Sequence, residues 1–488
     1  MRESMSDVDS CLMVTMSGTS VDPRLRRWLD SGLGSVILFG DNIVDVDQVG
    51  ALLAELRSSA PDLLVAIDEE GGDVTRLERR DGSSMPGNLA LGELDDLAVT
   101  ERVAGAIGDL LAGAGIDLDL APVADVNSNP QNPVIGSRSF GADPALVGRH
   151  VAAFVRGLQS RGVAACAKHF PGHGAAAADS HYELPIVDSP ADVLSTVDVA
   201  PFRAAIAAGA RCVMTSHVVY PAWDRAMPAT LSRRILTDLL RTELGFGGVL
   251  ITDALHMAAI REGVGSAEGA VRALAAGADL VCVDLALDEQ LAVRDSVVAA
   301  IESGRLPAER VAEAAGRVRA LQSWTHPTAA GAWNPEVGHA AARAAIARRQ
   351  LPPGVPLHRA PYVVDAGVRV LPGVGVTSAG LLDVMTSIDP RVRGMPLTAA
   401  PDDVDAVLAA AGDAPLVVAV RDAHRRAWQG ELVAAALARR RDAVVVGTGT
   451  ADDARLAPGR YIAAFGCGKA NLLAVAQLLL GRAREHAA

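Results

Sequence analysis

The stretch GGVLITDALHM, residues 247–257, contains the pattern that decides the fold. Within it, a short apolar run without charge at 248–252 leads directly to the carboxylate of Asp253. Such runs are typical of parallel strands that are buried on both faces. Comparable runs recur along the first part of the chain. They predict eight strands in all, at 11–16, 35–39, 63–67, 116–120, 163–167, 211–215, 248–252 and 279–283.

Helical patterns separate these runs. The clearest lie at 46–58, 98–114, 145–161, 200–208 and 233–244. Several are followed by a glycine that can form a left-handed cap, at Gly115, Gly162, Gly209 and Gly245. Eight strand–helix units within about 320 residues predict a (β/α)₈ barrel of the TIM type. A doubly wound open sheet is the main alternative.

The composition changes after the predicted barrel. Segments rich in Pro, Gly and Ala, at 325–331 and 352–361, flank a predicted helix at 336–349. The alternation then resumes with strands expected at 362–364, 415–420, 443–446 and 462–465, and helices at 430–440 and 470–480. We therefore expect a barrel over 1–325, a linker with a helix over 326–355, and a smaller α/β domain over 356–488.

The composition restricts the kinds of molecule that this protein is expected to bind. The 488 residues include 45 Lys and Arg against 58 Asp and Glu, a net charge of −13, which disfavours nucleic acid. Aromatic residues make up 3% of the chain, too few for a docking platform on a polymer or on stacked bases. We expect a small soluble ligand, and a monomer in preference to an oligomer.

The cysteines and the apolar segments bear on location. Four of the five cysteines lie in apolar strand-like runs, which favours buried free thiols and a reducing compartment. No stretch approaches the roughly 18 apolar residues of a membrane span, and the first ten residues do not resemble a signal peptide. The expected location is the cytoplasm, without membrane association.

Polar residues follow six of the predicted strands directly. A single charge after a strand is usually a helix cap or a solvated loop residue, but six sets converge on one rim of a barrel, where active sites are built. The sets include Asp68-Glu69-Glu70, Asp125, Lys168-His169, Ser216-His217, Asp253 and Asp284.

The segment KHFPGHGAAAADSH, residues 168–181, is the densest group of reactive side chains. Asp179 and His181 are two residues apart, so the carboxylate can hydrogen-bond one imidazole nitrogen and make the other an acid/base catalyst. Alternatively, Asp179 caps a helix and His181 has no role. A metal site from His169, His173, Asp179 and His181 is disfavoured because Pro171-Gly172 interrupts any helix there, so neither metal nor cofactor is expected.

Asp253 is the second candidate catalytic group. A carboxylate at the end of a buried strand, ionised and held by hydrogen-bond donors, could act as a nucleophile. A nucleophilic carboxylate and an acid/base are the two groups that retaining glycoside hydrolysis requires. His181 would then stand where many such enzymes use a second carboxyl group.

These segments resemble glycoside hydrolase family 3, in particular its bacterial β-N-acetylglucosaminidase branch. The resemblance runs over about residues 11–320, and the C-terminal VVAVRDAHRRAWQ and IAAFGCGKANL are more loosely similar to the α/β sandwich domain of some members. It is carried by the strings AIDEEGGDVTRL, NPVIGSRSFG, KHFPGHGAAAADSH, VMTSHVVYPAWD with PATLS, and LGFGGVLITDALHM.

The resemblance implies a role for individual residues. It makes Asp253 the nucleophile that forms a covalent glycosyl-enzyme, and His181 the general acid and base with Asp179 as its partner. It assigns the sugar hydroxyls to Asp68, Arg76, Arg138, Lys168 and His169. Charged groups of these kinds suit the hydroxyl pattern of a pyranose ring.

The chain departs from the family pattern at two positions. Asp73 stands where the family often has a basic residue, and Ala254 where several members have a second acid. Both changes could alter what is accepted beyond the first sugar.

The expected activity is that of a retaining exo-β-N-acetylglucosaminidase acting on soluble glycoconjugates or on cell-wall or chitin fragments. The alternatives are a phosphorylase that uses phosphate as acceptor, another β-glycosidase of the family, a non-catalytic sugar-binding protein, and a metal-dependent barrel hydrolase.

Overall fold

The computed structural model describes residues 2–329, 331–367, 370–371, 375–376 and 379–482. The chain divides into two compact units that do not follow chain order. The first unit comprises residues 1–70, 100–135 and 142–333, and the second comprises 71–99, 136–141 and 334–488. Two segments from the N-terminal part of the chain therefore belong to the second unit.

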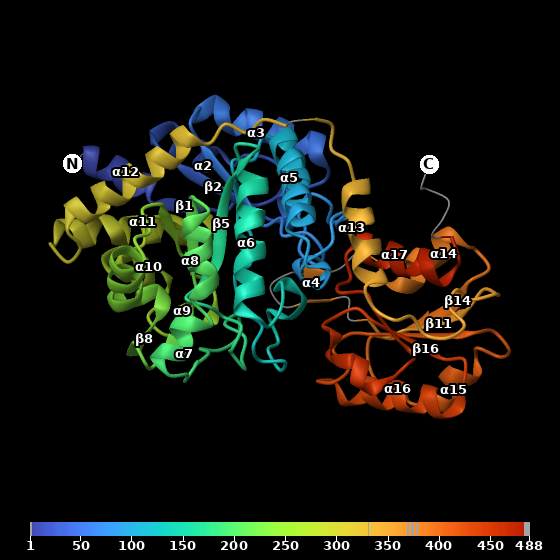
Figure 1. Cartoon of the computed structure of the whole chain (residues 1–488). Coiled ribbons are helices and arrows are strands. Elements are labelled where there is room, and N and C mark those ends of the chain that lie inside the picture. The colour runs from blue at the N-terminus through green and yellow to red at the C-terminus, as the bar shows by residue number, and fades with distance from the viewer. Residues whose placement is uncertain (1, 330, 368–369, 372–374, 377–378, 483–488) are drawn as a thin grey trace. The chain divides into compact units, whose positions relative to one another are not determined.

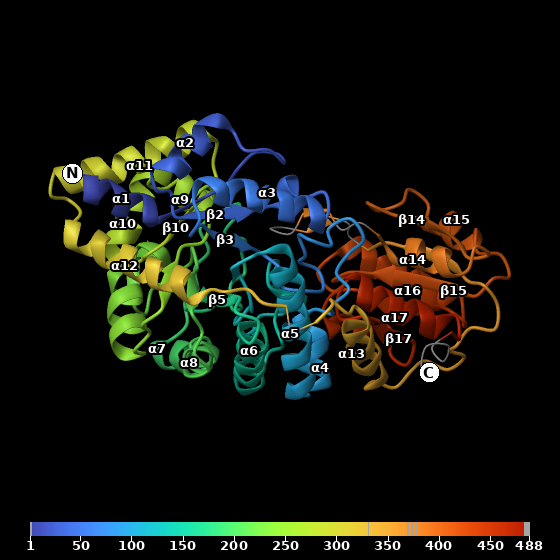
Figure 2. The same cartoon turned by 90° about the horizontal axis from the view of Figure 1, so that it is seen from above.

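The first unit is an eight-stranded parallel barrel surrounded by helices (Figures 1 and 2). All eight predicted strands are present, and a parallel bridge between Ile251 and Leu280 joins the two end strands of the hydrogen-bonded order β10-β1-β2-β3-β4-β5-β6-β9. The strands are β1 (Leu12–Val14), β2 (Ser35–Leu38), β3 (Leu64–Ile67), β4 (Leu118–Asp119), β5 (Ala164–Phe170), β6 (Cys212–Thr215), β9 (Val249–Ile251) and β10 (Val281–Val283). The barrel prediction is confirmed, in preference to the open sheet.

Helices connect the strands of this unit, and all four glycines predicted to cap helices have a positive φ. The longer elements are α1 (Arg2–Ser10), α2 (Pro23–Ser31), α3 (Val46–Ser59), α5 (Leu97–Ala114), α6 (Pro144–Gln159), α8 (Ala200–Ala207), the π-helical η4 (Arg234–Glu243), α10 (Ser266–Ala276), α11 (Leu287–Glu302) and α12 (Ala308–Trp324). Short turns are η1 (Gly40–Asn42), α7 (Ala191–Thr196), η3 (Ala229–Leu231) and α9 (Ala258–Arg261).

The barrel core is built from alternate residues of neighbouring strands. Leu64 and Ala66 of β3 pack in the same cluster as Cys166 of β5 and Met214 of β6, as expected for side chains that point to one face of a sheet. Cys11, Cys166, Cys212 and Cys282 are free and buried, as predicted, whereas Cys467 is half-buried.

Two features of the barrel differ from expectation. Strand β5 was expected to end at 167, but it continues through Lys168 and His169 to Phe170, with a register shift against β6 after Ala167. Polar side chains therefore lie within a strand rather than in the loop. An antiparallel pair, β7 (Val219–Tyr220) and β8 (Asp224–Pro228), was not predicted because neither segment forms a long apolar run.

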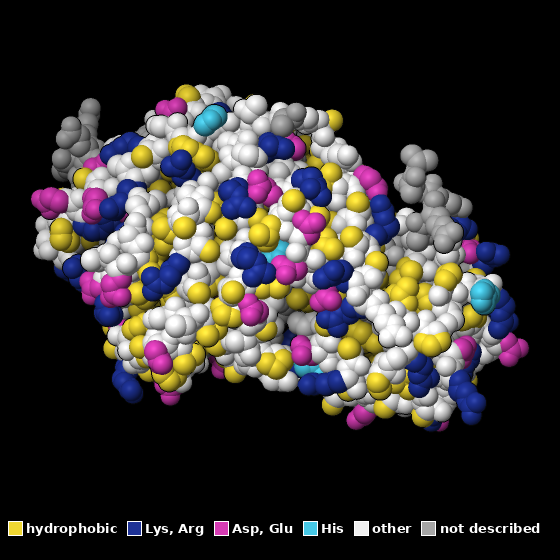
Figure 3. Space-filling model, viewed as in Figure 1, with side chains coloured by type: hydrophobic (Ala, Val, Ile, Leu, Met, Phe, Trp, Pro, Cys, Tyr) yellow, Lys and Arg dark blue, Asp and Glu magenta, His cyan; other side chains and the backbone are white. Residues whose placement is uncertain are grey.

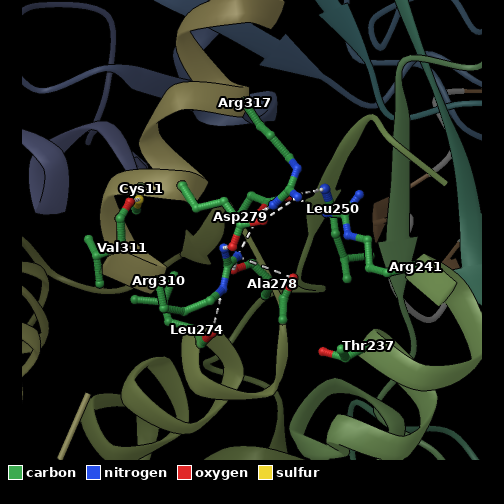
Figure 4. A network of polar contacts seen from close by, with 12 residues as sticks. Cys11, Thr237, Arg241, Leu250, Leu274, Ala278, Asp279, Arg310, Val311 and Arg317 are labelled. Atoms are coloured by element: carbon green, nitrogen blue, oxygen red, sulfur yellow. Dashed lines mark hydrogen bonds and ion pairs between the residues drawn. The ribbon is translucent and has the colours of Figure 1, made fainter. Parts of the chain in front are cut away.

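Asp279, at the amino-terminal end of β10, is the centre of a buried polar network (Figure 4). Its carboxylate pairs with Arg241 from η4, with Arg310 at 2.6 Å and with Arg317 at 3.1 Å, both from α12. The backbone N–H of Leu250 in β9 also donates to it at 2.9 Å. One carboxylate thus ties two strands and two helices together at the end of the barrel opposite the strand carboxyl ends.

The second unit contains a five-stranded parallel sheet with helices on both faces, which confirms the predicted α/β sandwich (Figure 1). The strand order is β14-β11-β15-β16-β17, and α13, α14 and α17 cover one face while α15 and α16 cover the other. The strands are β11 (Tyr362–Asp365), β14 (Arg393–Pro396), β15 (Leu416–Val420), β16 (Val444–Gly447) and β17 (Tyr461–Ala463), with a separate pair β12 (Val370–Leu371) and β13 (Gly375–Val376). The helices are α13 (Glu336–Ala347), α14 (Leu381–Ile388), α15 (Val404–Ala409), α16 (Ala427–Arg439), α17 (Lys469–Leu479) and the turn η5 (Ala451–Leu456).

The segment 71–99 is part of the core of this second unit. Its helix α4 (Asn88–Leu94) packs against α13, and Ala90 is buried in the same cluster as Ala342 and Ile346. Gly338 of α13 allows close approach, because a Cβ there would lie 2.1 Å from the carbonyl oxygen of Ser84. The segment 136–141 contains the short turn η2 (Gly136–Arg138).

The surface carries both signs of charge. On the face shown in Figure 3, basic and acidic side chains are interspersed, and neither forms a broad single-sign patch. None of the helices in the described ranges is long and apolar enough to cross a bilayer.

Candidate active site

Five of the predicted polar sets of the first unit follow β3, β4, β6, β9 and β10, and Lys168-His169 lies in the last part of β5. In a parallel barrel the carboxyl ends of all strands lie on one rim, so these loops meet there. Asp253 lies two residues beyond β9, and His217 lies two residues beyond β6.

Asp253 is held in its ionised form. Burial by itself would raise the pKa of this carboxyl, but the imidazoles of His217, His169 and His181 lower it. The backbone N–H of Ala254 also donates to Asp253 Oδ1 at 2.8 Å. Together these groups lower the pKa of Asp253 to about 2, so a carboxylate anion is available at any pH near neutrality.

Asp179 and His181 form the hydrogen bond that their spacing predicts. The Nδ1 of His181 lies 2.7 Å from Asp179 Oδ1, and the backbone N–H of His181 donates to the same oxygen at 2.9 Å. Burial opposes ionisation of Asp179, but these bonds outweigh it and lower the pKa of the carboxyl. The carboxylate thus holds the imidazole by Nδ1 and leaves Nε2 for proton transfer. Residues 179–181 lie in a turn, so Asp179 does not cap a helix.

Lys168 connects strand β5 to the loop that follows β3. Its buried ammonium group lies 2.7 Å from Asp68 Oδ1 and 2.7 Å from Glu70 Oε1, both in the segment that follows β3. Asp68 and Lys168 were predicted as site residues. Glu70 was noted only as part of the acidic run, and its proximity to Lys168 had no local sequence signal.

His169 is oriented by Asp125, a residue to which the sequence assigned no role. Asp125 Oδ2 lies 2.7 Å from His169 Nδ1, while Asp125 Oδ1 accepts the backbone N–H of His169 at 3.1 Å and that of His173 at 2.6 Å. The fully buried carboxylate of Asp125 therefore fixes both the ring of His169 and the backbone between the two histidines.

Two further histidines near Asp253 are buried. His217 donates from Nε2 to the carbonyl oxygen of Ala254 at 3.1 Å, and its Nδ1 lies 2.8 Å from Thr230 Oγ1. Burial lowers the pKa of His217, and it lowers the pKa of His173 to about 4. Its position after a predicted strand placed His217 among the rim residues, but the sequence assigned it no role.

Arg76 and Arg138, the remaining predicted binding residues, belong to the second unit. Arg76 is buried within the segment 71–99, and Arg138 is half-buried in the segment 136–141. The side-chain amide of Asn88 donates to the carbonyl oxygen of Arg138 at 2.7 Å. The structure therefore groups Asp253, His181, Asp179, Asp68, Lys168 and His169 in one unit and these two arginines in the other.

The histidine and acid residues do not form a metal centre in the part of the chain that the structure describes. No group of three or more His, Cys, Asp or Glu side chains there is arranged to hold a metal ion. The rings of His169 and His173 lie 6.1 Å apart at an angle of 71°, and His169 is turned toward Asp125.

The arrangement in the first unit supports covalent acid/base chemistry. The ionised Asp253 carboxylate interacts electrostatically with the His181 imidazole, and Nδ1 of that imidazole is held by the Asp179 carboxylate. An anionic nucleophile and a histidine that can give and take a proton are sufficient for substitution at an acetal carbon.

The chain is similar to known proteins over most of its length. The family described as "Glycosyl hydrolase family 3 N terminal domain" matches residues 14–321. A β-N-acetylglucosaminidase of that family from Paenibacillus has a solved structure with a TM-score of 0.87 and 34% identity, covering 98% of this chain and 96% of that one.

Two curated relatives are β-hexosaminidases. One, from Chromobacterium violaceum, is 37% identical over 352 residues, which are 70% of this chain and 94% of that protein. Beta-hexosaminidase A from Pseudoalteromonas piscicida is 35% identical over 334 residues, which are 62% of this chain. The match spans 56% of the length of the Pseudoalteromonas protein.

Proposed function

Because this chain belongs to glycosyl hydrolase family 3, we propose that it is a retaining exo-β-N-acetylglucosaminidase that releases terminal GlcNAc from soluble glycans. The observation that carries the proposal is the combination of an Asp253 carboxylate kept ionised by surrounding imidazoles with the hydrogen-bonded pair of Asp179 and His181. The choice of GlcNAc rests on the relatives, which are named as β-hexosaminidases and a β-N-acetylglucosaminidase.

In the first step, Asp253 attacks the anomeric carbon and forms a glycosyl ester, while His181 gives a proton to the departing glycosidic oxygen. In the second step, His181 takes a proton from water, which attacks the same carbon and releases Asp253. Asp179 accepts from Nδ1 throughout and stabilises the imidazole in either protonation state.

The sugar-binding roles follow the resemblance residue by residue. Asp68, Arg76, Arg138, Lys168 and His169 bind hydroxyls of the terminal sugar. The Lys168 ion pairs with Asp68 and Glu70 support this role, because a buried ammonium group held by two carboxylates presents a fixed donor pattern.

The natural substrates that fit are small GlcNAc-terminated fragments from cell-wall turnover or chitin. We also propose a cytoplasmic location and a part in peptidoglycan recycling. The four buried free cysteines support a reducing compartment.

A panel of aryl β-glycosides tests the function directly. The wild-type protein is expected to prefer the aryl β-GlcNAc over the corresponding glucoside and galactoside. Asp253→Ala should lower kcat/KM on the preferred substrate by about 10⁴-fold or more, because no other group replaces the nucleophile. Asp238→Ala, a half-buried carboxylate on η4, is the control and should retain activity. Near-wild-type turnover by Asp253→Ala contradicts the mechanism.

A phosphorylase is the second candidate, favoured by the histidine acid/base. After protonating the leaving group, His181 is neutral, whereas a carboxylate in its place would repel an incoming phosphate. Incubating the protein with substrate and millimolar phosphate and recording a phosphorus NMR spectrum decides between the two. A GlcNAc-1-phosphate signal identifies a phosphorylase, and its absence while the substrate is consumed identifies a hydrolase.

A further inference from the structure

Asp73, one of the two departures from the family pattern, is a buried carboxylate with three hydrogen-bond donors. Arg421 Nη2 donates to Asp73 Oδ2 at 2.7 Å, and the hydroxyl of Ser137 donates to the same oxygen at 2.6 Å. The backbone N–H of Cys467 donates to Asp73 Oδ1 at 2.6 Å. All four residues belong to the second unit.

The donors come from the carboxyl edge of the parallel sheet. Arg421 directly follows β15, and Cys467 lies in the loop between β17 and α17. In doubly wound sheets, this edge is where ligands bind. Here the hydrogen-bond donors at that edge, Arg421 and Cys467, bind Asp73, which is a carboxylate of the chain itself.

The backbone of the segment 71–99 lies close to the same edge. A Cβ on Gly468 would lie 2.6 Å from the carbonyl oxygen of Gly72, so the two backbones are in direct contact. The N–H of Ala470, in the first turn of α17, donates to the carbonyl oxygen of Ser83 at 3.0 Å. The segment is therefore held at several points and not by Asp73 alone.

Arg421 joins the two segments that the second unit takes from the N-terminal part of the chain. Its Nη2 also donates to Ser137 Oγ at 3.1 Å, and its Nη1 donates to the carbonyl oxygen of Thr448 at 2.8 Å. Ser137 immediately precedes Arg138, and Asp73 precedes Arg76 by three residues. One guanidinium thus fixes the backbone beside each of the two arginines to which the proposed function assigns sugar hydroxyls.

We propose that Arg421 is a positioning residue for sugar binding, which acts by holding the segments that carry Arg76 and Arg138. This inference rests on the proposed function, and it gives the C-terminal sheet a task in substrate recognition. Asp73 and Ser137 are the contacts through which Arg421 acts.

The charges of Asp73 and Arg421 support a permanent contact between these two side chains. Burial opposes ionisation of Asp73, but the Arg421 guanidinium and the three donated hydrogen bonds outweigh it and lower the pKa of the carboxyl. The pKa of Arg421 is raised by the same pairing, in spite of its burial. Lysine cannot replace Arg421, because its single ammonium group lacks the planar fork that reaches Asp73, Ser137 and Thr448 together.

A mutant cycle on the full-length protein tests the inference. Arg421→Met should raise KM for an aryl β-GlcNAc about 10-fold and change kcat less than about twofold, because ground-state binding is lost and the chemistry is not. In an Arg76→Ala/Arg138→Ala background the same substitution should change KM by less than about threefold, because both residues through which it acts are gone. Either single background should show an intermediate effect.

The dissociation constant of GlcNAc, measured by calorimetry, should follow KM in each variant. Arg440→Met is the matched control and should leave KM unchanged. The Arg440 guanidinium binds Asp442 and the carbonyls of Gly412 and Ala414. Arg440 precedes β16, whereas Arg421 follows β15. If Arg421→Met does not fold, Arg421→Lys retains the charge and should still raise KM.

The outcomes separate the two levels of inference. A wild-type protein without activity on aryl β-GlcNAc overturns the proposed function and this inference with it. Activity with an unchanged KM in folded Arg421→Met or Arg421→Lys overturns the positioning role alone. An Arg421→Met effect of equal size with and without Arg76 and Arg138 also overturns it, because that result describes a general loss of structure.

Discussion

At the scale of single residues, the chemistry depends on which carboxylates are left without a cation. The Lys168 ammonium group pairs with both Asp68 and Glu70, and the Arg421 guanidinium pairs with Asp73. Asp253 instead receives one backbone hydrogen bond and lies within reach of imidazoles. A carboxylate of that kind is ionised but not engaged in a strong ion pair, so it can attack an electrophilic carbon.

His181→Ala tests the acid role of this histidine. The expected loss in kcat/KM is about 10²–10⁴-fold for a natural disaccharide, whose leaving oxygen needs a proton, and much smaller for a dinitrophenyl glycoside, which leaves as a stable anion. Because kcat/KM reports formation of the glycosyl-enzyme, loss of the base in the second step does not mask the difference. Glu183→Ala, an exposed neighbour, is the control. Equal losses on both substrates would contradict the assignment.

Sequence reasoning predicted the residue contacts that are local and missed those that are not. The hydrogen bond between Asp179 and His181 follows from a spacing of two residues. Asp125 and His169 are 44 residues apart, and their pairing depends on the alignment of β4 with β5. The catalytic and binding roles themselves stay predictions until the variants are measured.

At the scale of secondary-structure elements, burial made the barrel strands predictable. A strand covered on both faces is mostly apolar, so five of the eight appeared as charge-free runs, and only the runs at 116–120, 211–215 and 279–283 contain a charged residue. Strand β14 reads RGMP and is partly exposed at the edge of its sheet, so it carries no such signal. Strand β5 was predicted too short because its last residues carry polar side chains that serve the rim.

Asp279→Ala tests how the barrel elements are held at their amino-terminal end. Removing the shared acceptor leaves Arg241, Arg310 and Arg317 without their common partner and should lower the free energy of unfolding by about 3 kcal/mol. Urea denaturation measures the change, and kcat/KM should stay near the wild-type value because the network lies away from the catalytic rim.

Glu313→Ala is the matched control for that experiment. Glu313 is exposed and pairs with two of the same arginines, Arg310 and Arg317, so its loss should cost less than about 1 kcal/mol. A similar loss in the free energy of unfolding for both substitutions would show that the burial of Asp279 does not increase its contribution to stability.

At the scale of the whole molecule, chain order and compact units differ. The sequence indicated a barrel followed by a smaller domain, because a change in composition is seen along the chain and does not show which segments pack together. No local pattern marks 71–99 and 136–141 as part of the second unit. Their apolar residues resemble those of any other barrel loop, and contacts between residues far apart in the sequence distinguish them, such as α4 on α13 and Arg421 on Ser137.

This division predicts that a chain ending at residue 333 does not fold as an independent barrel. Without residues 334–488, Ala90 loses the core in which it is buried, Leu89 and Leu94 lose the cluster they pack against, and the Asp73 carboxylate loses Arg421. Buried apolar area of this kind is worth about 25 cal/mol per Å², and exposing it favours aggregation. The expected result is a low soluble fraction and weak near-UV circular dichroism.

The same truncation with Leu89→Glu, Leu94→Lys and Asp73→Asn should recover solubility, because it removes the exposed apolar face and the unpaired charge. A truncated chain that is soluble and unfolds cooperatively without these changes would show that α4 and its segment need no partner.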